Sequence, residues 1–255
     1  QGEATRLIVG GVGPLPGKTM VEKCEYFQRH FDPIRLLLTR EPRGHRDMLA
    51  AVVTEPVSPN GDFGLFYMDA RRYPYLCGHA TIGAVATLVK LGRLAAADGE
   101  KTFVVDTPSG PLEARTRIQD GSAVSVAIRM VPSFVYATDQ IVDVPKLGPV
   151  SIDLVCVGGF FAMVDAGRAG IDLAAETGRR LVSLGMAVID AANEACTVRH
   201  PERPEVRTVD VSEFYSESPG SRFSGKSAVI YGESHIDRSP CGTGTTAKMT
   251  LLHHW

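Results

Sequence analysis

Two cysteines in this 255-residue chain open similar short segments, and they are the residues best suited to do chemistry. Cys77 begins Cys77-Gly-His-Ala-Thr-Ile-Gly83, and Cys241 begins Cys241-Gly-Thr-Gly-Thr-Thr-Ala247. Each segment follows a turn that contains a proline and leads into a pattern typical of a helix. A thiol at a helix N-terminus has a depressed pKa, so each cysteine is predicted to act as a base near neutral pH.

The amides that follow each cysteine add a second chemical function. A helix start carries unpaired N–H groups and a partial positive charge, which together bind a carboxylate well. We expect the amides of Gly78–His79 and Gly242–Thr243 to hold a carboxylate and to stabilise charge that develops beside it. If the two helix starts face each other, one thiolate removes a proton from a carbon and the opposite thiol supplies one. The residues therefore predict inversion at the α-carbon of an amino acid, with no cofactor.

The elements that position these cysteines form two similar passes along the chain. The first pass is expected to contain strands at 5–9, 34–39, 48–54 and 63–68, helices at 19–31 and 84–91, and closing strands at 102–106, 112–117 and 123–130. The second is expected to open with strand-like residues at 150–157 and the glycine-containing segment 158–165. A helix at 173–192, strands at 206–215 and 227–231, and a helix at 248–252 are expected to follow. The alternation of apolar residues and the Gly and Pro punctuation support these assignments.

The two passes predict two domains, 1–136 with Cys77 and 137–255 with Cys241. The second half has no counterpart of the three strands that close the first half. A sheet left in that state would expose an edge, so we expect the natural chain to continue beyond residue 255.

The two cysteine segments resemble the signature motifs of the proline racemase and hydroxyproline 2-epimerase family. The second motif, Asp237-Arg-Ser-Pro-Cys-Gly-Thr-Gly-Thr245, is the more specific of the two. The Gly-His-Ala-Thr stretch of the first also occurs in related isomerases of phenazine biosynthesis. Further matches to the family are Gly2-Glu3 with Arg6, Glu41-Pro-Arg-Gly-His45, Thr54-Glu-Pro-Val-Ser58, Thr107-Pro-Ser-Gly110 and Gly158-Gly159.

The resemblance implies an α/β (α+β) fold similar to that of diaminopimelate epimerase. Two pseudo-symmetric halves would each wrap a curved, mostly antiparallel, barrel-like sheet around a central helix. The resemblance also implies a homodimer without a cofactor, whose substrate is an imino acid. Transferred to this sequence, the family's catalytic thiols are Cys77 and Cys241. The remaining site residues so implied are His79 and Asp237 at the ring nitrogen of the substrate, and Gly78, Gly242 and Thr243 at its carboxylate.

Two alternatives to an epimerase of proline or 4-hydroxyproline stay open. Family members that dehydrate trans-3-hydroxy-L-proline typically carry Thr at the second catalytic position, so Cys241 argues against such a lyase. The absent closing strands leave room for a catalytically inactive member.

The composition excludes several other classes of protein. A hydrophobic content of 44%, a charged content of 22% and a net charge of −2 are ordinary for a soluble globular protein. Without a basic stripe the chain is not expected to bind nucleic acid, and its apolar runs are too short to span a membrane. The five cysteines and seven histidines show no metal-ligand spacing. Reduced thiols favour a cytoplasmic enzyme, in which Cys24, Cys156 and Cys196 are structural.

Overall fold

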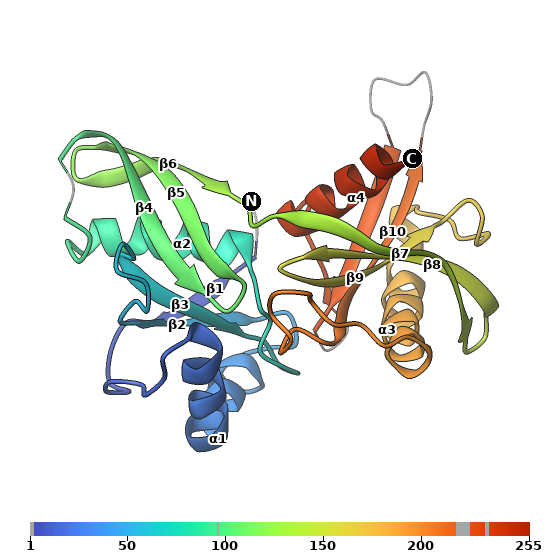
Figure 1. Cartoon of the computed structure of the whole chain (residues 1–255), viewed down its shortest axis with the longest axis horizontal. Helices are drawn as coiled ribbons and strands as arrows, with labels where there is room; N and C mark the ends of the chain where they lie inside the picture. Colours follow the sequence, from blue (N-terminus) through green and yellow to red (C-terminus); the bar gives the residue numbers. More distant parts are fainter. Residues whose placement is uncertain (1–2, 96, 218–224, 233–234) are drawn as a thin grey trace. The chain divides into compact units, whose positions relative to one another are not determined.

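The computed structural model describes residues 3–95, 97–217, 225–232 and 235–255. The chain divides into two compact units, one that ends at Val131 and one that begins at Pro132 (Figure 1). The boundary expected after residue 136 falls inside strand β7 (Ser133–Val144), which opens the second unit. Gly2, which contributes to the family resemblance, lies outside the described residues.

The first unit is built on a six-stranded sheet in which neighbours in sequence are neighbours in space. Its strands are β1 (Thr5–Ile8), β2 (Leu49–Thr54), β3 (Phe63–Met68), β4 (Gly99–Thr107), β5 (Gly110–Gln119) and β6 (Ser122–Arg129). The pairs β1–β2 and β3–β4 are parallel, and the other three are antiparallel. The strands predicted in this half, apart from 34–39, are confirmed.

Two helices cover the two faces of β2 and β3. Helix α2 (Gly78–Lys90) lies in the curve of the sheet (Figure 1) and packs against Leu49, Ala51 and Tyr67. Helix α1 (Met20–Thr39) covers the opposite face, against alternate residues of the same strands. Because both faces are buried, these two strands are apolar almost throughout.

Helix α1 is longer than the sequence predicts, and the strand expected at 34–39 is wrong. Pro33 lies inside the helix, where it removes one backbone hydrogen bond. The helix continues because side-chain contacts before and after Arg35 hold the next turn. The Arg35 guanidinium pairs with Asp32 (Nε–Oδ1 2.6 Å), and the Thr39 hydroxyl donates to the carbonyl of Arg35 over 2.8 Å.

The second unit also has a six-stranded sheet among its described residues, in the order β12-β11-β10-β9-β8-β7. The strands after β7 are β8 (Gly148–Val157), β9 (Gly159–Asp165), β10 (Val209–Glu217), β11 (Gly225–Tyr231) and β12 (His235–Ile236). Of the strand pairs that the structure describes in this unit, β9–β10 is parallel and the others are antiparallel. Strand β7 was not expected from the sequence.

Helices α3 and α4 lie on opposite faces of this second sheet. One 3-10 turn (Ala175–Thr177) precedes α3 (Gly178–Ala195), so the regular helix begins later than predicted. Gly185 of α3 lies so close to β10 and β11 that a Cβ there would be 2.7 Å from Ser212 and Ile230. Helix α4 (Gly242–His254) begins six residues before the predicted 248 and faces the other side of β10 and β11 at Gly244.

The predicted internal repeat is confirmed. The series β9–α3–β10–β11–α4 repeats β1–α1–β2–β3–α2, with a parallel strand pair followed by an antiparallel one in both units. The expected α+β class with two similar halves is therefore confirmed as well. In each unit the second helix of the series begins directly after one of the two cysteines.

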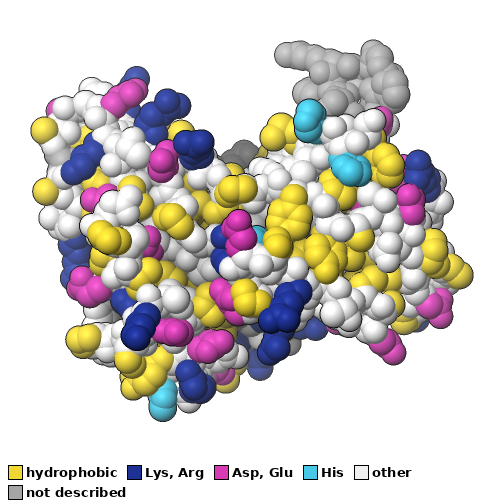
Figure 2. Space-filling view, viewed as in Figure 1, with side chains coloured by type: hydrophobic (Ala, Val, Ile, Leu, Met, Phe, Trp, Pro, Cys, Tyr) yellow, Lys and Arg dark blue, Asp and Glu magenta, His cyan; other side chains and the backbone are white. Residues whose placement is uncertain are grey.

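Charged side chains of both signs are interspersed over the face of the molecule shown in Figure 2. Among the helices of the described residues, none is long and apolar enough to cross a membrane.

Candidate active site

Cys77 is the N-cap of α2, as the sequence predicts. Its backbone is extended (φ −146°, ψ 107°), and its side chain is 9% exposed. The first helical hydrogen bond runs from the amide of Thr81 to the carbonyl of Cys77 over 3.1 Å. The amides of Gly78 and His79 precede that bond and stand at the open end of the helix, where a carboxylate binds best.

The imidazole of His79 lies beside the thiol of Cys77. Its Nδ1 is 3.5 Å from the sulfur, which is within reach of a weak hydrogen bond. The predicted role of His79 is a contact with the substrate's ring nitrogen, and this remains a prediction. The structure adds a direct contact with the thiol itself.

A buried pair of hydroxyls supports Cys77 from below. The Tyr67 hydroxyl lies 2.6 Å from that of Thr81, which donates to the carbonyl of Cys77 over 2.8 Å. Tyr67 and Thr81 have no exposed surface, and burial raises the pKa of Tyr67 well above its usual range. The two hydroxyls below the carbonyl of Cys77 are thus neutral groups. Sequence patterns did not reveal this pair, because Tyr67 reads as one more apolar position of β3.

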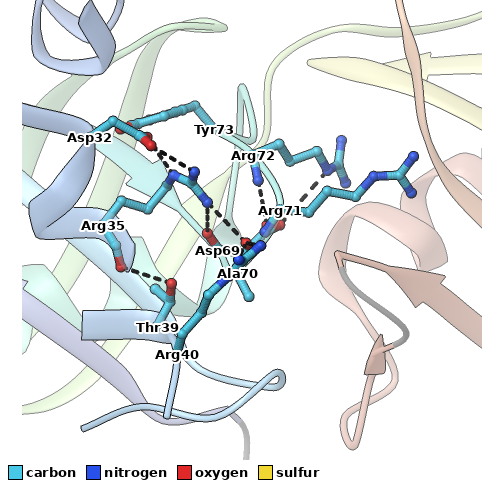
Figure 3. A network of polar contacts seen from close by, with 9 residues as sticks. All are labelled: Asp32, Arg35, Thr39, Arg40, Asp69, Ala70, Arg71, Arg72 and Tyr73. Carbon is cyan, nitrogen blue, oxygen red and sulfur yellow. Dashed lines mark hydrogen bonds and ion pairs between the residues drawn. The ribbon is translucent and has the colours of Figure 1, made fainter. Parts of the chain in front are cut away.

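The loop that leads to Cys77 is fastened to α1 by the guanidinium of Arg35 (Figure 3). Arg35 donates to the carbonyls of Asp69 and Ala70 over 3.1 and 2.9 Å. The opposite side of the guanidinium binds both carboxylate oxygens of Asp32, which also accepts from the hydroxyl of Tyr73 over 2.8 Å. Arg35 is 8% exposed. Strong, charge-assisted bonds therefore fix where this loop leaves β3.

Asp69 turns the same loop. Its Oδ1 accepts from the amides of Arg71 and Arg72 over 2.7 and 2.8 Å, and its own amide donates to the carbonyl of Arg72. Arg40 adds a second guanidinium at the carbonyl of Ala70 (Figure 3). Polar contacts thus hold the first residues of the loop that runs from β3 to Cys77.

Cys241 is the N-cap of α4 and has a strained backbone, with φ +56° and ψ 111°. A residue other than glycine in that region persists only where its surroundings hold it. The amide of Gly244 donates to its sulfur over 3.3 Å, and the Thr243 hydroxyl lies 3.4 Å from the sulfur. The first helical bond joins the amide of Thr245 to the carbonyl of Cys241, so Gly242 and Thr243 stand at the open end.

Asp237 orders the turn before Cys241. Its Oδ1 accepts from both the amide and the hydroxyl of Ser239, over 2.8 and 2.7 Å. The Ser239 oxygen in turn accepts from the amide of Cys241 over 3.2 Å. Asp237 thus acts on the cysteine through Ser239, in addition to its predicted contact with substrate. Ser239 was part of the matched motif, but the sequence assigned it no role.

The expected depression of the thiol pKa is wrong for Cys241. Burial, followed by the negative charge of Asp237, raises the pKa of Cys241 to about 12. The hydroxyl of Thr243 and the amide of Gly244 act in the opposite direction, and the charge of Glu213 raises the pKa further. Desolvation of the thiolate raises the pKa more than the amides at the helix N-terminus lower it. Cys241 is therefore a thiol near neutral pH, which suits a proton donor.

The predicted residues fall into one cluster in each unit. Cys77, Gly78 and His79 are together at the start of α2, and the other cluster holds Asp237, Cys241, Gly242 and Thr243 at the start of α4. In both, the side chain two residues after the cysteine touches the sulfur. Within the described residues, no group of three or more His, Cys, Asp or Glu side chains could hold a metal ion. The cysteines outside the clusters are unbridged, with Cys24 and Cys156 buried and Cys196 partly so.

The family model for proline racemase matches residues 1–255 of this chain. The chain belongs to the proline racemase family. A proline racemase of Clostridioides difficile is 38% identical over 252 residues, which cover 99% of this chain and 75% of that protein. A 4-hydroxyproline 2-epimerase of Streptosporangium roseum is 37% identical over 253 residues, covering 99% and 76%.

The solved structures agree with this membership of the proline racemase family. A hydroxyproline epimerase from Agrobacterium vitis, with bound trans-4-hydroxy-L-proline, superposes with a TM-score of 0.90 at 27% identity. The match covers 99% of this chain and 74% of that one. The chain is an isomerase of the racemase and epimerase class.

Proposed function

We propose that this protein inverts the α-carbon of proline or of a hydroxyproline, with Cys77 and Cys241 as the two acid–base groups. The observation that carries the proposal is the matched placement of these cysteines. Each is the buried N-cap of a helix, and each has two amides at the open end of that helix. Relatives named for proline and for hydroxyproline support this class of substrate.

The reaction follows from the chemistry of those groups. The amides of Gly78 and His79, with those of Gly242 and Thr243, bind the carboxylate and stabilise the enediolate that forms from it. One sulfur, as a thiolate, takes the α-proton while the carbon keeps the electron pair. The other sulfur, as a thiol, gives its proton to the opposite face of that carbon. His79 and Asp237 are proposed to bind the ring nitrogen.

The raised pKa of Cys241 suggests which sulfur starts in which form. With a pKa of about 12, Cys241 holds its proton and is the donor in the resting enzyme. Cys77 is then the base. The roles reverse when the product enantiomer is the substrate.

The proposal is tested by incubating the purified protein with L-proline and with trans-4-hydroxy-L-proline in deuterated water. We expect inverted product that carries deuterium at the α-carbon, detected by chiral chromatography and mass spectrometry. Retained configuration without deuterium, for both substrates, contradicts the proposal. Loss of water from trans-3-hydroxy-L-proline would instead identify a lyase.

Variants then test the two-thiol assignment. Cys77→Ser and Cys241→Ser should each lower the rate by at least about 100-fold, because serine is a much weaker acid and base at these positions. Cys196→Ser is the matched control. It changes a partly exposed thiol at the end of α3 and should leave the rate unchanged. Full activity in either of the first two variants refutes the assignment.

We also propose that the enzyme works as a cytoplasmic homodimer. Five free cysteines support a reducing compartment, and the dimer is supported by the family resemblance alone. Light scattering after size-exclusion chromatography tests the dimer, and fractionation of the source cells tests the compartment.

A further inference from the structure

Glu213 is a buried acid in the middle of β10 that the reaction outlined above does not use. Its side chain has no exposed surface, and neither carboxylate oxygen has a hydrogen-bond partner among the described residues. Its neighbours across the sheet are Val229 on β11 and Met163 on β9. An acid in such a place is costly to bury, so its presence calls for a function.

The carboxylate of Glu213 lies against the first turn of α4. A Cβ on Gly244 would be 2.8 Å from Glu213 Oε2 and 3.3 Å from the Cβ of Cys241. Gly244 also donates its amide to the sulfur of Cys241. Gly244 therefore lies against both the Glu213 carboxylate and Cys241. The carboxylate is just below the helical turn that caps on the Cys241 thiol.

The first unit has no acid at the matching position. The pair Glu213–Val229 in β10 and β11 corresponds to Ala51–Tyr67 in β2 and β3, and both pairs face the helix that follows a cysteine. Below Cys77 the polar groups are neutral hydroxyls. Glu213 is thus a buried acid of the second unit at a sheet position where the first unit has Ala51.

Neighbouring polar and charged groups only partly offset the effect of burial on the pKa of Glu213. Lys248 of α4 donates to the carbonyl of Ser216 over 3.3 Å and lowers the pKa of Glu213, as does Ser227 of β11. Burial outweighs both and raises the pKa of Glu213 to about 7. Asp237, before α4, adds a second negative charge that acts on Cys241.

We propose that Glu213 is a positioning residue that opposes ionisation of Cys241, in addition to the effects of burial and of Asp237, and so favours the thiol form of Cys241 in the resting enzyme. This inference rests on the proposed function of the two thiols. In turnover, a C–H bond breaks as an S–H bond forms at Cys77, and the S–H bond of Cys241 breaks as the new C–H bond forms. The enzyme then holds a thiolate at Cys241 beside Glu213. Repulsion between them favours return of a proton from water to Cys241, as Cys77 releases its own.

The test is the pH dependence of iodoacetamide alkylation at Cys241, followed by mass spectrometry of the Cys241 peptide in the full chain. In Glu213→Gln the shape is kept and the charge is removed. The alkylation profile should therefore move to lower pH by about one pH unit, with roughly tenfold faster alkylation at a fixed pH. Glu217→Gln is the control, because Glu217 is on the same strand but exposed. An unchanged profile in Glu213→Gln overturns the proposal.

The wild-type protein provides a test that does not depend on the folding of a variant. As Glu213 ionises near pH 7, it should oppose formation of the thiolate, so the rate rises less than tenfold per pH unit across that range. A constant tenfold rise through the range contradicts the proposal. Because alkylation needs no turnover, these results stand apart from the proposed function. An active Cys241→Ser variant would refute the function and leave the coupling of Glu213 to Cys241 unaffected.

Discussion

The amide of Gly244 donates a hydrogen bond to the sulfur of Cys241 over 3.3 Å, and no side chain fits at that glycine. A Cβ there would lie 2.8 Å from both Glu213 Oε2 and Val229 Cγ2, two buried side chains of the sheet below. The second glycine of the Cys-Gly-Thr-Gly motif is thus explained by close packing. Its backbone needs no special φ, since Gly244 is helical.

Gly244→Ala should destabilise the protein by about 1–3 kcal/mol, because the added methyl group overfills a packed interface. It should also displace the carboxylate of Glu213 and disturb the cap at Cys241. Thermal unfolding measures the first effect. The control is Gly83→Ala in α2, where a Cβ meets nothing within 4 Å and should stabilise the helix by about 1 kcal/mol. Equal melting temperatures for the two variants would contradict the packing argument.

Arg35→Lys should lower stability by about 2–3 kcal/mol, because an ammonium cannot bind the Asp32 carboxylate and two carbonyls together. The loop before Cys77 loses its anchor, so we also expect a fall in kcat of roughly tenfold or more. Chemical denaturation and turnover assays measure the two effects.

The control for that substitution lies on the same helix. Arg29 and Glu25 form an ion pair of 4.0 Å in which both side chains are more than half exposed. Arg29→Lys should change stability by less than about 0.5 kcal/mol. If Arg35→Lys were equally mild, the contacts in Figure 3 would not anchor the loop.

The extent to which sequence predicted the structure differed between elements. The apolar runs of β2 and β3 and the Cys-Gly motifs at both N-caps are local signals, so the sequence located these elements. It failed at residues 34–39, where Pro33 suggests a helix end. The turn after Pro33 is held in part by local contacts of Arg35 with Asp32 and Thr39. Arg35 also donates to the carbonyls of Asp69 and Ala70, more than thirty residues away, and sequence periodicity cannot show those contacts.

The sequence predicted the motifs of the candidate site but not the buried residues that pack beneath them. Cys77, Cys241 and the glycines beside them are visible as a repeated pattern. The supporting groups Tyr67 and Glu213 come from strands, and only the folded sheet brings them below the helix starts. Glu213 does not stand out in the sequence, because β10 also carries Asp210 and Glu217. The sequence could not predict the raised pKa of Cys241, because burial in the folded protein is its main cause.

Tyr67→Phe should destabilise the protein by about 1–2 kcal/mol, because the buried hydroxyl of Thr81 loses its neighbour at 2.6 Å. Tyr136→Phe is the matched control. Its hydroxyl donates to Thr197 over 3.4 Å at a side chain that is 39% exposed, so we expect a change below about 0.5 kcal/mol. Urea unfolding distinguishes the two, and equal losses would show that the hydroxyl pair below Cys77 contributes nothing.

The buried thiols should make the fold sensitive to alkaline pH. Burial raises the pKa of Cys24 from 9.0 to about 12. Between these two values the unfolded chain has lost a proton that the folded chain keeps. The folded state binds more protons, so its stability is full below pH 9 and falls as the pH rises. The fall attributable to Cys24 is at most about 1.4 kcal/mol per pH unit. Cys24→Ala should be less stable at neutral pH, because it leaves a small cavity, but its stability should decline less steeply above pH 9. Urea unfolding at a series of pH values compares the two slopes, and parallel slopes would mean that Cys24 ionises equally in the folded and unfolded states.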